Sequence, residues 1–152
     1  MIYDIRLGRR GLSNMTRMRE NRKIITLVWC KLQKICFFQH FPLYRLSDTI
    51  CTEPDAPPLP ERNKLFRLKI DALSKESTDY LVSKFRPRVA FGGHTHHGCL
   101  VEHFYKEFDN VHFLEYSVPS FSWRNRPDPK YMLVSSHYPR FIFILCNDSN
   151  LS

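Results

Sequence analysis

The sequence predicts a mixed α/β fold that becomes rich in strands toward its C-terminal end. Three observations support this prediction: a capped helix pattern at residues 73–86, a short apolar strand pattern on either side of it, and a series of strand patterns after residue 98. Strands that alternate with a helix indicate an α/β arrangement, whereas consecutive strands indicate hairpins. The length of 152 residues is that of one ordinary domain.

The predicted helix begins after Ser74 and ends before Pro87. The Ser74 side chain can accept a hydrogen bond from a free N–H group of the first turn, and Glu76 suits the positive end of the helix dipole. Leu81 and Phe85 lie four residues apart, so they mark the buried face of the helix. Pro87 disfavours helical backbone in the residue before it, which ends the element.

Short apolar runs predict the strands. Ile35–Phe38 and Val89–Phe91 are expected to be buried, and the glycines at 92 and 93 end the second of them. Four further strands are expected toward the C-terminus, in two pairs: Cys99–Tyr105 with Val111–Val118, and Tyr131–Ser136 with Arg140–Cys146. The proline-rich residues 46–64 are predicted to form a loop.

The positive charge is concentrated at the start of the chain. Residues 1–34 hold nine basic and two acidic side chains, while the whole chain has a net charge of +8. We therefore divide the chain into a basic arm of uncertain structure (1–33), a partial α/β domain (34–146) and a tail (147–152). A basic head can bind RNA or anionic lipid, but a solvated arm is the simpler interpretation, and no nucleic acid is expected as a partner.

Membrane and redox signals are weak. The apolar stretch Ile24–Cys30 is far shorter than the ~20 residues that cross a bilayer, and no signal peptide is visible, so the chain is expected to be soluble. The five cysteines are irregularly spaced, and their odd number argues against a complete disulfide framework. Cys51, in the polar loop, is the best candidate for an exposed thiol.

The residues with the clearest chemical signal are histidines at strand ends. His94 and His96 follow the strand that ends at Gly92-Gly93, and His40 follows the strand Ile35–Phe38. Neutral imidazole is a good ligand for Zn, Mn or Fe, and the glycines allow a tight turn with no side chain in the way. Strand ends from two neighbouring strands can bring these histidines to one metal ion.

A structural zinc site is the alternative for the same region, because it is dense in nitrogen and sulfur ligands. Its candidate ligands are His94, His96, His97, Cys99 and His103. Their spacing matches none of the usual paired zinc signatures. We expect His97 and His103 to be hydrogen-bonded or exposed instead.

The segment Pro119–Arg126 has an unusual sequence, Pro-Ser-Phe-Ser-Trp-Arg-Asn-Arg. Two interpretations stay open. It is either a loop anchored in the core by its aromatic side chains, or a substrate-binding wall in which Arg124 or Arg126 faces an anionic group.

These segments together resemble the C-terminal half of a calcineurin-like metallophosphoesterase, whose fold is an α/β/β/α sandwich. The resemblance covers residues 34–134. Its motifs are Gln39–Arg45, Asp71–Ser74, Arg86–Arg88, Gly93–His96 and Ser117–Arg126. The Gly-His-x-His motif is shared across the superfamily. The Ser-Phe-Ser-Trp-Arg-Asn-Arg stretch is similar to one branch, the phosphodiesterases that remove ethanolamine phosphate from a mannose of the GPI anchor.

The resemblance implies a site with two divalent metal ions, Mn by family preference. His40 and His94 would bind one ion and His96 the other, and the two ions would activate a water molecule and neutralise the phosphoryl oxygens. It also implies a GPI-anchor glycolipid as substrate, a role in ER-to-Golgi transport, and a place at the endoplasmic reticulum or Golgi membrane.

The upstream ligand segments of the family have no counterpart here, because the chain contains no Gly-Asp and no Gly-Asn dipeptide. We therefore expect a truncated phosphodiesterase with no transmembrane segment, which holds at most one metal weakly and is inactive by itself. The alternatives are a nonenzymatic remnant that binds RNA or anionic lipid through its basic head, and a small structural zinc module.

Overall fold

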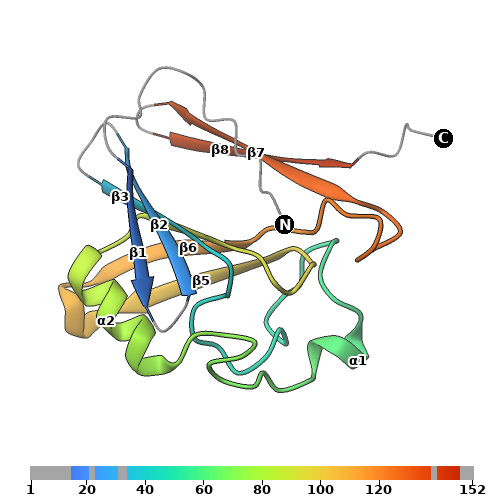
Figure 1. Cartoon of the computed structure of the whole chain (residues 1–152), viewed down its shortest axis with the longest axis horizontal. Coiled ribbons are helices and arrows are strands. Elements are labelled where there is room, and N and C mark those ends of the chain that lie inside the picture. Colours follow the sequence, from blue (N-terminus) through green and yellow to red (C-terminus); the bar gives the residue numbers. More distant parts are fainter. Residues whose placement is uncertain (1–14, 21–22, 31–33, 138–139, 148–152) are drawn as a thin grey trace.

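The computed structural model describes residues 15–20, 23–30, 34–137 and 140–147, with side-chain surroundings for residues 35–134. Its elements are mainly strands, with two α-helices between the third and fourth strands (Figure 1). In chain order they are β1 (Met15–Glu20), β2 (Lys23–Cys30), β3 (Lys34–Gln39), α1 (Leu59–Arg62), α2 (Lys75–Phe85), β4 (Val89–Gly92), β5 (Cys99–Tyr105), the 3₁₀ helix η1 (Lys106–Phe108), β6 (Val111–Ser117), β7 (Lys130–His137) and β8 (Arg140–Asn147).

The main sheet has six strands in the order β1-β2-β3-β4-β6-β5. Its centre is parallel, since β3 pairs with β4 and β4 pairs with β6 in the same direction. The outer strands β1, β2 and β5 join antiparallel to their neighbours. β7 and β8 form a separate antiparallel hairpin. The predicted α/β class and its increase in strand content toward the C-terminus are confirmed.

Both faces of the central strands are covered. Phe37 of β3 belongs to the core cluster beneath α2, whereas its neighbour Cys36 belongs to the cluster that packs against β7. Successive side chains of a strand point to opposite faces, so a strand covered on both sides is apolar throughout. Figure 1 shows α2 and the β7–β8 hairpin on opposite sides of the sheet. The layers are therefore helix, sheet and hairpin.

Helix α2 follows the predicted boundaries. The Ser74 hydroxyl accepts a hydrogen bond from the Ser77 N–H at 3.2 Å, and Arg86 ends the helix in the left-handed conformation (φ 45°). Leu81 is buried, and Phe85 packs against the same core. The helix is thus held at its start by a side-chain cap and along its face by apolar packing.

Replacing Ser74 by alanine should lower the free energy of unfolding by about 1 kcal/mol, because one amide of the first turn loses its partner. Urea unfolding followed by circular dichroism measures this change. Ser83→Ala is the matched control, since Ser83 lies in the same helix, is exposed, and donates its hydroxyl to the Tyr80 carbonyl rather than capping the first turn. Equal stability of the two variants would contradict a capping role for Ser74.

The sequence predicted no element in residues 1–22, yet β1 occupies Met15–Glu20. β1 is an edge strand, paired only with β2, and an edge position tolerates charged residues such as Arg17 and Arg19 that hide the usual strand pattern. The division at residues 33 and 147 stays a prediction.

Among the described residues, no helix combines the length and apolar character needed to cross a membrane.

Candidate metal centre

The parallel pairing of β3 and β4 places two histidines at one edge of the sheet. His40 directly follows β3, and His94 lies two residues beyond β4. The Gly93 N–H donates to the His40 carbonyl at 3.0 Å, which joins the two strand ends beyond the last strand residues. The rings meet as well, because His94 Nδ1 lies 3.2 Å from His40 Nε2.

Further groups orient the His94 ring. His94 Nε2 lies 3.7 Å from Asp71 Oδ1, and the ring packs against Phe41. Arg67 donates two side-chain bonds and one backbone bond to Asp71, which hold the pKa of that carboxyl well below its usual range. A carboxylate on the far nitrogen of a histidine is the usual way in which a metal-binding ring is oriented.

The spacing of the two nitrogens fits one shared metal ion. Ligands about 2.1 Å from an ion lie about 3.0 Å apart at right angles and about 3.4 Å apart at the tetrahedral angle. The 3.2 Å between His40 and His94 falls between these values. Neutral imidazole also supplies the lone pair that such an ion needs. The pair therefore suits a divalent metal as two of its ligands.

The loop after β4 is conformationally strained. His94 and His96 have φ values of 71° and 64°, in the left-handed region that residues with a side chain rarely adopt. Such conformations cost on the order of 1–3 kcal/mol each and persist only where surrounding contacts fix them. The Thr95 N–H bonds the Gly93 carbonyl at 2.9 Å, but most contacts that fix the loop come from other segments.

His96 is placed through its backbone. Its carbonyl accepts from the Ser120 N–H at 3.1 Å and from Arg126 Nη1 at 3.0 Å. Burial lowers the pKa of its ring, and electrostatic interactions with His94, His97 and Arg126 lower it further. His96 therefore belongs to the same loop as His94, and its role as ligand to a second metal stays a prediction.

Arg126 is buried and fully engaged. A guanidinium has five N–H donors, and five hydrogen bonds are present. Two go to Asp55, at 2.6 and 3.0 Å, two to Asp128, at 2.9 and 3.0 Å, and one to the His96 carbonyl. The bonds to Asp55 and Asp128 raise the pKa of Arg126. Arg126 thus has no donor left for a substrate anion in this arrangement.

The aromatic side chains and Arg124 of the Pro119–Arg126 segment face solvent, whereas Pro119 and Ser120 are buried. Phe121 and Trp123 are 64% and 67% exposed, so aromatic side chains do not anchor this loop in the core, and that interpretation was wrong. The buried guanidinium of Arg126 anchors it instead. Arg124 is exposed and its contact with a substrate stays a prediction.

A buried carboxylate lies beside Gly92, the last residue of β4, since a Cβ atom on Gly92 would be 3.6 Å from Glu115 Oε1. Glu115 of β6 is fully buried and accepts bonds from the Leu43 N–H at 2.7 Å and from His103 Nε2 at 2.8 Å. Arg45 lies 3.6 Å away and also bonds Asp48. Burial pushes the pKa of Glu115 upward, but His103, Arg45 and the Leu43 amide hold it below its usual value.

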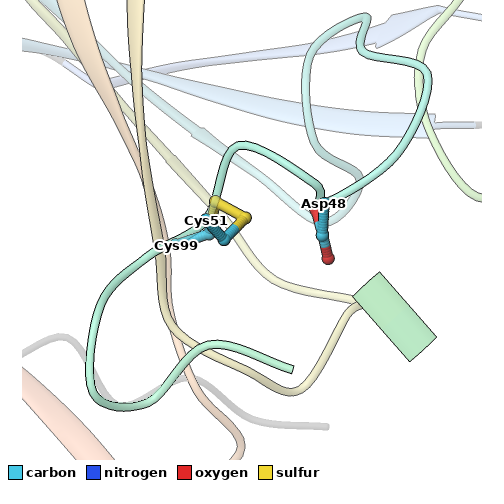
Figure 2. Close-up of side chains that lie close together, drawn as sticks. All are labelled: Asp48, Cys51 and Cys99. Carbon is cyan, nitrogen blue, oxygen red and sulfur yellow. A yellow bond between two sulfur atoms is a disulfide. The ribbon is translucent and has the colours of Figure 1, made fainter. Parts of the chain in front are cut away.

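Cys51 and Cys99 form a disulfide bond, so the expectation of an exposed Cys51 thiol was wrong; Cys51 is fully buried (Figure 2). The bond joins the 46–58 loop to the start of β5. Asp48 lies close enough to both sulfurs to suggest a metal triad. However, disulfide sulfurs are not thiolate ligands, and Asp48 is already paired with Arg45 at 2.8 Å.

The structural zinc alternative also loses two of its five ligands, because Cys99 is in the disulfide and His103 bonds Glu115. His103 is hydrogen-bonded, as expected. His97 approaches Glu61 of α1 at 3.6 Å. Asp55 and Glu115 were not singled out from the sequence, and Asp71 was named only as part of the Asp71–Ser74 motif, because an isolated acidic residue gives no signal until its partners are known.

Comparison with known proteins gives curated matches that include several Metallophosphoesterase 1 proteins. Metallophosphoesterase 1 of Danio rerio is 43% identical over 71% of the chain, and that of Xenopus laevis is 36% identical over 88%. The Metallophosphoesterase 1 homolog of Drosophila melanogaster is 44% identical over 64%. No protein-family model matches the chain, and no solved structure does.

The matched region is a limited part of these relatives. It covers 27% of the Danio rerio protein, 32% of the Xenopus laevis protein and 24% of the Drosophila melanogaster protein. The chain therefore spans about a quarter to a third of the length of the curated relatives that it matches. Over that part, these relatives support a metallophosphoesterase family for the chain.

Proposed function

We propose that the chain is the C-terminal part of a metal-dependent phosphodiesterase, with His40 and His94 as ligands of one divalent metal ion. The observation that supports this most is the 3.2 Å contact between His94 Nδ1 and His40 Nε2 at adjacent strand ends. His96 is proposed as a ligand of a second ion. Mn²⁺ is the proposed metal, in keeping with the family that the sequence resembles.

Two such ions would supply an activated water molecule and would neutralise charge on a phosphoryl group. The chain's own residues would hold and orient them: Asp71 orients the His94 ring, and the Gly93 amide fixes the His40 carbonyl. The proposed substrate is ethanolamine phosphate on a GPI anchor, processed at the membranes of the early secretory pathway. By itself the chain is proposed to bind one metal weakly and to be inactive.

The test is titration of the full chain with Mn²⁺ by calorimetry, in the wild type and in His40→Ala. We expect one site, and an affinity reduced at least about tenfold in the variant. His40→Ala is preferable to a change at His94, because alanine at φ 71° would add backbone strain. The control is His112→Ala, which removes a half-exposed imidazole that pairs with Glu102 of β5. His112 lies near the start of β6, whereas the histidine pair follows the ends of β3 and β4.

Equal Mn²⁺ affinity in the wild type and in His40→Ala would contradict the metal site. The proposed inactivity is tested with bis(p-nitrophenyl) phosphate in the presence of Mn²⁺. Turnover that His40→Ala abolishes would overturn that part of the proposal and would show that the chain works as an enzyme.

A further inference from the structure

The segment His94–Gly98 must be held by contacts outside itself. Two of its residues, His94 and His96, adopt left-handed backbone conformations. Such conformations persist only where the surrounding structure fixes them. The position of a metal ligand on such a loop therefore depends on the groups that hold the loop.

The contacts that fix this segment converge on Asp55, in the 46–58 loop. The Gly98 N–H donates both to the Asp55 carbonyl at 3.0 Å and to Asp55 Oδ2 at 3.1 Å. A Cβ atom on Gly98 would lie 3.2 Å from the Asp55 side chain, so Asp55 packs directly against the segment's backbone. Asp55 therefore holds the C-terminal end of the segment.

Asp55 also bonds Arg126, the residue that holds the middle of the segment. Arg126 donates to the His96 carbonyl from Nη1, the same nitrogen that bonds Asp55 Oδ2. The side chains of Arg126 and Asp55 are only 6% and 8% exposed, so each needs the other's charge. Lys130 adds a second cation on Asp55 Oδ1. Without the Asp55 carboxylate, Arg126 and Lys130 would share only the exposed Asp128 as an anionic partner among the described residues.

We propose that Asp55 is a positioning residue, which acts through Arg126 and the Gly98 amide to hold the His94–Gly98 segment in the conformation that brings His94 to His40. This rests on the proposed metal function of the histidine pair. It also gives Arg126 a different task from substrate binding: its five donors serve Asp55, Asp128 and the His96 carbonyl.

Asp128 offers a matched control. It bonds the same Arg126 and lies 3.2 Å from Lys130, but its side chain is 57% exposed. Its described contacts do not reach the His94–Gly98 segment. Asp55→Asn and Asp128→Asn therefore each remove one negative charge from the same cation pair, and only the first touches the segment.

The first readout is amide hydrogen exchange in the full chain without metal. Relative to the Leu43 amide, which bonds Glu115, the Gly98 and Ser120 amides should exchange at least about tenfold faster in Asp55→Asn. They should be unchanged in Asp128→Asn. Arg126→Lys, which keeps one positive charge but not five donors, should accelerate Ser120 more than Gly98. This variant covers the case in which Asp55→Asn fails to fold.

The second readout is Mn²⁺ affinity, which should fall about tenfold or more in Asp55→Asn and remain at the wild-type value in Asp128→Asn. Loss of thermal stability without a local change at Gly98 and Ser120 would overturn the proposal, because it would indicate a merely structural ion pair. Equal Mn²⁺ binding by wild type and His40→Ala would instead overturn the proposed function, while the exchange result would still decide whether Asp55 holds the loop.

Discussion

Removing the bond between Cys51 and Cys99 is expected to lower the free energy of unfolding by about 4 kcal/mol. The two cysteines are 48 residues apart in the sequence, and closing a loop of that length restricts the unfolded chain by about this amount in the chain-entropy model. A Cys51→Ala/Cys99→Ala double variant compared with the wild type in urea unfolding measures the difference. Both positions are buried, so the small alanine side chains fit them without a buried polar group.

A reductant separates the effect of the bond from that of the substitutions. Dithiothreitol should destabilise the wild type by nearly the same amount and leave the double variant unchanged. If the wild type unfolds at the same urea concentration with and without reductant, the bond does not contribute to stability. Peptide mass spectrometry after thiol labelling identifies which cysteines are bonded in each sample.

Replacing Glu115 by glutamine is expected to cost about 3 kcal/mol, the loss typical of breaking a buried ion pair by removing one partner. Glutamine keeps an oxygen for the Leu43 N–H but loses the charge that faces Arg45 and His103. Because Leu43 lies only three residues after His40, the variant should also weaken Mn²⁺ binding. Chemical denaturation at neutral pH measures the stability change.

Glu115 also makes stability depend on acid. Its pKa is lower in the folded chain than in the unfolded chain, so the unfolded state binds a proton first as the pH falls. The stabilisation is present above about pH 4.3, the ordinary glutamate value, and is lost as the pH falls through the folded pKa. In Glu115→Gln, the decline of unfolding free energy with falling pH should be shallower by up to about 1.4 kcal/mol per pH unit.

Glu102→Gln is the control for both effects. Glu102 also pairs with a histidine, His112, but its side chain is 69% exposed. An exposed pair contributes about 0.2–1 kcal/mol. A loss in Glu115→Gln no larger than that in Glu102→Gln would show that the buried carboxylate is not the origin of the stability.

Much of the fold could be predicted because its signals are local. The Ser74 cap and the strand at Cys99–Tyr105 lie where the sequence placed them. β1 was missed because edge pairing with β2 determines it and no apolar alternation marks it. The short helix α1 was missed as well, since it has four residues, none of them buried, within a proline-rich loop.

Within the candidate site, the sequence indicated the histidines but not the residues that hold them in place. Histidines that follow strands indicated a shared edge, and the parallel pairing of β3 with β4 places His40 and His94 in contact there, while their role as metal ligands stays a prediction. The residues that hold the histidines in place do so through contacts between segments far apart in the chain. Asp55 bonds Arg126, 71 residues away, and Leu43 bonds Glu115, 72 residues away. The disulfide was missed for the same reason, because spacing alone does not show which cysteines approach each other.

The parallel pairing of β3 and β4 has a consequence for the order in which the molecule folds. Cys36 pairs with Val89, so a segment of about fifty residues must be closed before the two strands meet. The hairpin of β5 and β6 can form early, since its strands are neighbours in the chain. We therefore expect His40 and His94 to come together late in folding, so that a metal ion held by both would bind after the sheet has formed.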